Sequence, residues 1–193
     1  MSLHNTYYVL RHGNSLANQQ KIVISDIQHG RDAYGLSPWG IAQVVRTLEN
    51  WPFPKPDIIF HSDFKRTTET AALVSDHLSV PLKPNPALRE RYFGDFEKLD
   101  DSHYPPVWQH DAEDPEHEFG NVESLESVCA RQMAFIKELE QQYNGKHILL
   151  VGHGDPLQIL LTHFLDKPLN QHRELVHLET AEVRALIPEY DKA

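Results

Sequence analysis

The sequence feature that most constrains the fold is a short apolar run, HILLVG, at His147–Gly152. The run is long enough for a strand and too short for a buried helix. A strand that is apolar at successive positions is buried on both faces, which is typical of the centre of a parallel sheet covered by helices. We therefore expect a central strand at His147–Gly152.

Shorter apolar runs elsewhere alternate with longer segments of helical periodicity. Strands are predicted at Thr6–Arg11 and at residues 57–62, and helices at residues 37–50, Lys65–Leu78, 124–143 and 156–164. Residues 175–187 predict two short strands at one edge of the sheet, and residues 80–99 predict short extended pieces around prolines. This alternation favours an α/β fold with three α/β/α layers, in which helices flank a mostly parallel central sheet. With no internal repeat, residues 1–193 are expected to form a single domain.

A polar segment with several prolines separates the predicted strands from the long helix. Residues 100–123, DDSHYPPVWQHDAEDPEHEFGNVE, predict a long loop. Loops of this length are commonly functional, so we expect a variable lid at about residues 98–123. Tyr104 and Trp108 either line a pocket from this lid or anchor the lid to the body.

Three histidines, His103, His110 and His117, recur every seven residues in this segment, close to acidic residues. The spacing is compatible with a metal site or with a solvated lid. Because prolines interrupt any regular helix that would align the three rings, the solvated lid is the favoured interpretation.

Composition excludes several classes of function. The formal net charge of −10 argues against a nucleic-acid partner, which requires a basic face. No apolar run reaches membrane-spanning length, and the first residues lack a signal-peptide pattern. The single cysteine, Cys129, excludes an intrachain disulfide framework. We expect a cytoplasmic protein without a membrane partner, and the sequence does not indicate an oligomeric state.

Polar residues follow the predicted strands where each of them ends. The first strand leads into Arg11-His12-Gly13, the strand at His147–Gly152 leads into His153-Gly154, and Arg66 lies one turn into the helix after residues 57–62. Sites in open α/β sheets form at the carboxyl ends of the strands, where glycines allow close approach of a ligand.

These residue types suit a phosphate. Arginine binds phosphate bidentately and stays charged, and histidine acts as a nucleophile or an acid near neutral pH. The chain contains no Walker loop and no HExxH or CxxC pattern, so we expect neither a metal nor a cofactor.

Five motifs in order resemble the histidine phosphatase superfamily, in its phosphoglycerate mutase-like branch. They are RHGxxxxN at 11–18, SDFKRTTETA at 62–71, LRERYFG at 88–94, ESLESV at 123–128 and VGHGDPL at 151–157. The resemblance runs from Tyr7 to about Leu160 and implies a phosphoglycerate mutase-like fold.

The resemblance also implies residue roles. His12 is the expected nucleophile, and Glu90 is the expected proton donor and then the base that activates water. Arg11, Arg66 and His153 are expected to bind the phosphate oxygens and are also counted as catalytic. Asn18 is expected to hydrogen-bond to the phosphate, and Arg91 to help bind the substrate.

The chain departs from the family pattern at three places. Asn14 stands where Glu or Gln is common, and Ile24-Ser25 replaces a small polar residue and a glycine. Asp155 follows His153-Gly154, close to the expected pocket, and the sequence does not show whether it helps or restricts the substrate.

The same superfamily contains mutases and phosphatases. No Lys or Arg occurs between Leu99 and Ala130, whereas the mutases resembled carry basic residues in this insertion, and acidic residues would repel a second phosphate. We therefore expect a metal-independent phosphatase for a small phosphomonoester with a neutral or cationic body. Phosphoglycerate mutase-type transfer and a phosphoprotein phosphatase or signalling module remain alternatives, and the physiological substrate cannot be read from the sequence.

Overall fold

The computed structural model describes residues 3–187. Within them lie five strands, β1 (Thr6–Arg11), β2 (Ile58–His61), β3 (Leu82–Pro84), β4 (His147–Gly152) and β5 (Val183–Leu186). The α-helices are α1 (Leu16–Gln20), α2 (Ile27–Gly30), α3 (Pro38–Glu49), α4 (Lys65–Leu78), α5 (Tyr104–Glu113), α6 (Leu125–Gln142) and α7 (Gly154–Phe164). Short 3-10 helices are η1 (Pro86–Leu88), η2 (Gly94–Phe96), η3 (Asp101–His103), η4 (Phe119–Asn121) and η5 (Leu169–Gln171).

The strands form one sheet in the order β3-β2-β4-β1-β5. Strand β4 pairs in parallel with both β1 and β2, and β2 pairs in parallel with β3. Only β5 is antiparallel, at the edge beside β1. The central position and complete burial of Ile148 through Gly152 in β4 confirm the prediction made from its apolar sequence.

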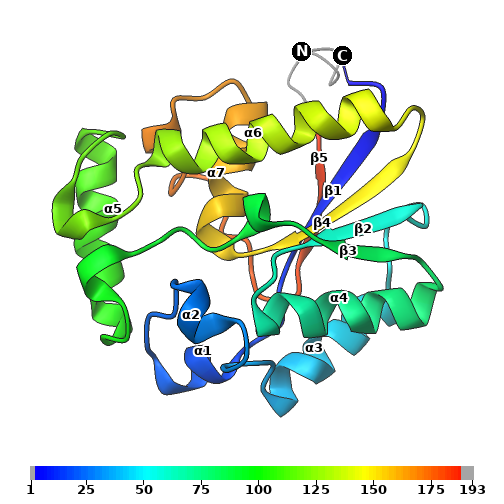
Figure 1. Cartoon of the computed structure of the whole chain (residues 1–193), viewed down its shortest axis with the longest axis horizontal. Helices are drawn as coiled ribbons and strands as arrows, with labels where there is room; N and C mark the ends of the chain where they lie inside the picture. Colours follow the sequence, from blue (N-terminus) through cyan, green and yellow to red (C-terminus); the bar gives the residue numbers. More distant parts are fainter. Residues whose placement is uncertain (1–2, 188–193) are drawn as a thin grey trace.

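Two apolar layers cover the faces of this sheet. On one face, Phe135 and Ile136 of α6 and Leu160 of α7 pack against strand residues such as Leu150. On the other face, side chains of α3 and α4 pack against Leu149 and its neighbours. Figure 1 shows α6 on one side of the sheet and α3 and α4 on the other, so the expected α/β/α layering is confirmed. None of the helices within residues 3–187 combines the length and apolarity needed to cross a membrane.

The prediction of a loop over residues 100–123 is wrong, because α5 occupies ten of these residues and η3 and η4 flank it. Pro105 and Pro106 lie in the first turn of α5, where a missing N–H costs no intrahelical hydrogen bond. Val107 is fully buried in a small apolar cluster with Val23, Phe93 and Val122, which fixes the helix to the body. Figure 1 shows α5 beyond the end of the sheet, apart from the covering helices.

The prediction of two strands over residues 175–187 is also wrong, because only β5 forms there. The preceding residues are held by side chains: Arg184 donates to the carbonyls of Val176 and His177, and Gln158 accepts from the Leu178 N–H. These hydrogen bonds stand in place of strand pairing and hold residues 175–178 where the chain crosses the end of the sheet. The short helices α1 and α2, capped by Ser15 and Asp26, have no counterpart in the sequence predictions.

Candidate active site

The carboxyl ends of three parallel strands converge on a cavity of about 260 Å³. His12 follows β1, His153 follows β4, and Arg66 lies in the first turn of α4, which follows β2. The cavity wall contains five of the predicted site residues, namely Arg11, His12, Asn18, Arg66 and Glu90. His153 and Arg91 lie outside the wall described for this cavity.

His12 is held with one ring nitrogen free. It is 3% exposed, and its Nδ1 lies 2.7 Å from the carbonyl oxygen of Gly13. Because a carbonyl oxygen can only accept, Nδ1 carries the proton and Nε2 keeps its lone pair. Burial lowers the pKa of His12 well below its usual value, and the cations of Arg66 and Arg11 lower it further. His12 is therefore neutral at physiological pH, with a nucleophilic Nε2.

His153 supports the site from behind this ring. Its ring centroid lies 5.3 Å from that of His12, at an interplanar angle of 67°. Nδ1 accepts from Arg66 Nε at 3.2 Å, so the proton of a neutral ring is on Nε2, which lies 2.9 Å from Ser62 Oγ. Burial, followed by the charge of Arg66, lowers the pKa of His153 well below its usual value. In this arrangement His153 orients Arg66.

Two guanidinium groups make the inner end of the cavity positive. Arg66 is 4% exposed and donates to the carbonyl of Ile24 at 2.8 Å. Arg11 donates to the carbonyl of Leu178 at 2.7 Å, and its buried Nε has no partner among the described residues. A Cβ at Gly154 would lie 3.0 Å from that Nε, so glycine lets the guanidinium approach the start of α7. Two partly unsatisfied guanidiniums beside a neutral histidine suit a phosphate dianion.

Glu90 is the acidic group of the inner end. Its Oε2 lies 3.4 Å from Arg66 Nη2 and 3.5 Å from His153 Nδ1. Its Oε1 accepts from the Arg91 N–H at 2.9 Å. Burial raises the pKa of Glu90 to about 7, although the charge of Arg66 opposes the increase. Glu90 is therefore part protonated near neutral pH, as an acid and base in one reaction cycle requires.

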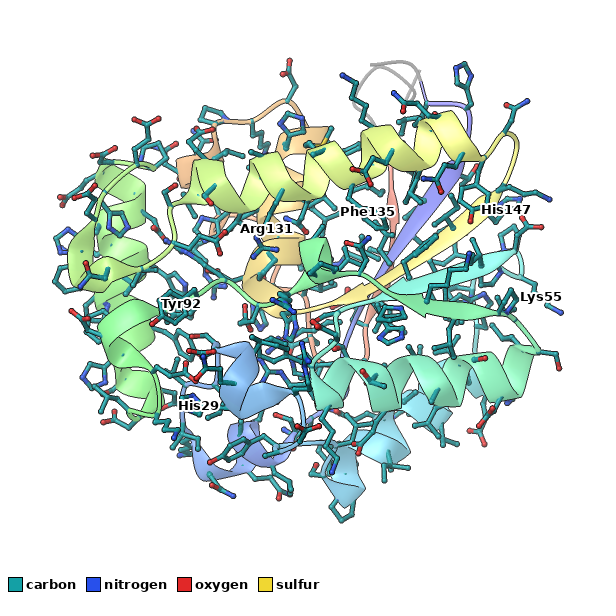
Figure 2. The ribbon with its side chains drawn as sticks, viewed as in Figure 1. His29, Lys55, Tyr92, Arg131, Phe135 and His147 are labelled. Carbon is teal, nitrogen blue, oxygen red and sulfur yellow. The ribbon has the colours of Figure 1, made fainter. Side chains whose placement is uncertain are left out.

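Arg131 fixes the backbone that carries Glu90, a role that the sequence analysis missed. From α6 it donates to the carbonyls of Ala87 at 2.6 Å and Glu90 at 3.2 Å. Glu123, within the ESLESV motif, binds its Nε at 2.9 Å. Figure 2 shows Arg131 between α6 and the segment that leads to Tyr92.

Arg91 lies in a buried ion-pair network next to the cavity. Its guanidinium is fully buried and donates to both oxygens of Asp111 at 2.7 Å and to Asp155 Oδ2 at 3.1 Å. Asp155 lines the cavity, and its Oδ1 lies 3.1 Å from His172 Nε2. Burial tends to raise the pKa of Asp155, but His172 and Arg91 lower it below its usual value. The guanidinium of Arg91 thus holds Asp155 and α5 in place.

Metal-ligand geometry within residues 3–187 is confined to one group, Asp111, Asp155 and His172, whose ligand atoms lie within 4.8 Å of one another. Arg91 already binds both carboxylates of this group, which is the arrangement of an ion pair. The three histidines of the 100–123 segment have separate partners: His117 contacts Asp111 at 2.6 Å, His103 contacts Asp100, and His110 stacks on Phe119 with ring centroids 4.1 Å apart.

The residues at the departures from the family pattern have structural partners. Asn14 accepts from the Ser37 hydroxyl, on the side of α3. Ser25 donates from its N–H and its hydroxyl to Glu97, while Ile24 lines the cavity. Asn18 also lines the cavity, and its Oδ1 accepts from the N–H and hydroxyl of Ser15 as half of a capping box.

Aromatic and basic residues form the outer wall of the cavity. Tyr104 and Trp108 of α5 line it, as one of the two sequence interpretations expected. Arg173 and His177, which follow α7, line it as well, and the sequence analysis missed both. No motif surrounds them, and only the path of residues 172–178 across the sheet end brings them there.

Comparison with known proteins is consistent with this geometry. The sequence model of the histidine phosphatase superfamily (branch 1) matches residues 7–193. The chain is 29% identical over 190 residues to an uncharacterized phosphatase, PhoE, of Bacillus subtilis, covering 95% of this chain and 92% of that protein. It is 27% identical over 169 residues to the adenosylcobalamin/alpha-ribazole phosphatase of Escherichia coli, covering 83% of this chain and 79% of that protein.

Among solved structures, mycobacterial glucosyl-3-phosphoglycerate phosphatase superposes with a TM-score of 0.79 at 24% identity, covering 94% of this chain and 90% of that chain. This likeness establishes the expected phosphoglycerate mutase-like fold.

Proposed function

The chain belongs to branch 1 of the histidine phosphatase superfamily, and on this premise we propose that it hydrolyses a small phosphomonoester, without a metal, through a phosphohistidine at His12. One observation carries the proposal. The free Nε2 of a neutral, buried His12 shares a cavity with Arg11, Arg66 and the raised-pKa carboxyl of Glu90. That set contains a nucleophile, a phosphate-binding pair and a proton donor.

The first step forms the phosphoenzyme. His12 Nε2 attacks phosphorus, the bond from phosphorus to the ester oxygen breaks, and Glu90 gives its proton to the leaving alcohol. Arg11 and Arg66 bind the non-bridging oxygens and balance their charge in a largely buried site. His153 holds Arg66 Nε in this orientation, so its contribution to phosphate binding passes through Arg66.

The second step returns the enzyme to its starting state. Water attacks phosphorus, Glu90 as carboxylate accepts its proton, and the bond between phosphorus and His12 Nε2 breaks to release inorganic phosphate. A Glu90 pKa of about 7 supports both roles, because neither the acid nor the carboxylate is rare near neutral pH. The amide NH2 of Asn18 has no partner among the described residues, so we propose that it donates a further hydrogen bond to the phosphate.

Mutase-type transfer is the alternative within the same chemistry. It requires the cavity to hold a second phosphate while the phosphoenzyme is protected from water. Helix α5 carries no Lys or Arg, and Arg173 is the single arginine of the outer wall within the described residues. The lining therefore favours hydrolysis.

Hydrolysis of p-nitrophenyl phosphate in EDTA tests the proposal. We expect turnover by the unmodified chain and its loss, by about 10³-fold or more, in His12→Ala. His163→Ala, at an exposed histidine near the end of α7, is the matched control and keeps full activity. Equal activity of His12→Ala and the control would overturn the proposed mechanism, and activity that EDTA abolishes would overturn metal independence.

A further inference from the structure

The outer wall of the cavity is a continuous series of side-chain contacts that joins three segments of the chain. Arg173 Cζ lies 3.7 Å from the ring centroid of Trp108. The Trp108 ring is stacked on Tyr104, with centroids 5.5 Å apart and 8° between the planes. Tyr104 in turn meets Phe93 edge to face at 4.8 Å. Helix α5 thus fixes the position of Arg173 through its aromatic face.

Arg173 has hydrogen-bonding capacity that the protein does not use. Within residues 3–187 its guanidinium donates no hydrogen bond, and its nearest carboxylate oxygen, Asp155 Oδ1, is 3.7 Å away. Asp155 is already bound by His172 at 3.1 Å and by Arg91 at 3.1 Å. Stacking occupies only the face of a guanidinium, so its N–H groups remain free in the plane.

His177 contacts the arginine at the phosphate end of the cavity and lines the same cavity as Arg173. His177 Nε2 lies 3.2 Å from Arg11 Nη1, and all three residues line the same cavity. Burial lowers the pKa of His177, and the charges of Arg11 and Arg173 lower it further. A ligand whose phosphate binds Arg11 can therefore extend toward Arg173.

We propose that Arg173 binds a carboxylate on the leaving alcohol, so that the substrates are small phosphomonoesters carrying a carboxylate. This inference rests on the proposed function. A planar carboxylate matches the two-pronged edge of a stacked guanidinium. A second phosphate dianion fits less well, because Arg173 is one cation and the acidic residues Asp101 and Asp155 share the wall. The cavity of about 260 Å³ also favours a small ester.

The inference replaces the expectation of a neutral or cationic substrate body, which came from the acidic residues between 100 and 123. Of those residues, Asp101 lines the cavity, whereas Asp111 is buried against Arg91. Only part of the negative charge of the segment therefore faces a substrate, and the cation Arg173 comes from outside the segment.

Two esters that differ only at the proposed contact provide the test. In 3-phosphoglycerate a carboxylate stands where glycerol 3-phosphate has a hydroxymethyl group. We expect the unmodified chain to favour 3-phosphoglycerate by about 10-fold or more in kcat/KM. Arg173→Ala should lower kcat/KM for 3-phosphoglycerate by about 10- to 100-fold and reduce the preference toward unity. Arg173→Lys, which keeps the charge and loses the fork, should retain an intermediate preference.

Arg46→Ala, at an exposed arginine of α3, is the matched control and should leave the preference unchanged. The inference is overturned if the unmodified chain shows no preference, if it hydrolyses p-nitrophenyl phosphate but neither ester, or if both Arg173 variants keep the full preference. Those results leave the proposed phosphatase standing. Absence of turnover on every ester, together with absence of a phosphohistidine, overturns the proposed function and the inference with it.

Discussion

The inner end and the outer wall of the cavity are built on different principles. At the inner end, Arg66 and His153 are buried, bonded to each other and attached next to strands of one sheet. At the outer wall, Arg173 is 28% exposed, donates no hydrogen bond to a described residue and lies in a turn that packs against Trp108 of α5. The side chains of the inner end are therefore held in fixed positions that suit one reaction. The outer wall instead offers the unused N–H groups of Arg173, which can distinguish one substrate from another.

The largest expected effect comes from removing the acid of the inner end, Glu90. Glu90→Gln cannot donate a proton, so hydrolysis of alkyl phosphates should fall by about 10²- to 10⁴-fold. The loss should be smaller with p-nitrophenyl phosphate, whose leaving group needs little protonation. Steady-state kcat/KM on both esters measures this difference, and equal losses would contradict the acid role.

The pH dependence of the unmodified chain follows from the raised pKa of Glu90. Glu90 is protonated below about pH 7 and ionised above it. Where the first step limits kcat/KM on an alkyl phosphate, the rate should fall as pH rises through about 7. This limb should be absent from Glu90→Gln, and a limb that persists in the variant would belong to another group.

The next prediction concerns stability and tests the buried ion pair that holds α5 to the body. Asp111 of α5 is fully buried against Arg91, so Asp111→Asn leaves a buried guanidinium with an incomplete partner. We expect the free energy of unfolding to fall by about 3–5 kcal/mol in a denaturant titration. Glu138→Gln, on the exposed side of α6, is the control and should change it by less than about 0.5 kcal/mol. A small loss for Asp111→Asn would mean that the apolar and aromatic contacts of α5 hold the helix without this ion pair.

The smallest expected effect concerns Asn18, which lines the cavity. Loss of one phosphate hydrogen bond in Asn18→Ala should raise KM for p-nitrophenyl phosphate by about 5- to 10-fold. Asn18→Asp keeps an oxygen for Ser15 but adds a negative charge to the cavity wall, so its KM should rise more. If both variants lose stability with KM unchanged, Asn18 serves only as a helix cap.

The sequence predicted the inner end better than the outer wall, for physical reasons. Strand ends in a parallel sheet meet at one edge, so the positions of His12, Arg66 and His153 followed from the predicted strands. Helix α5 was missed because Pro105 and Pro106 were interpreted as helix breakers, although in a first turn they are tolerated. Arg173 reaches the cavity through contacts of a segment without regular structure, which no local pattern predicts.

Detection of the phosphoenzyme tests the central claim most directly. Glu90→Gln should still transfer phosphate from p-nitrophenyl phosphate to His12, because that leaving group needs little acid, but it lacks the base for hydrolysis. Quenching at high pH, where phosphohistidine survives, followed by peptide mass spectrometry should locate one phosphate on His12. No phosphopeptide, or phosphate on another residue during turnover, would contradict the account.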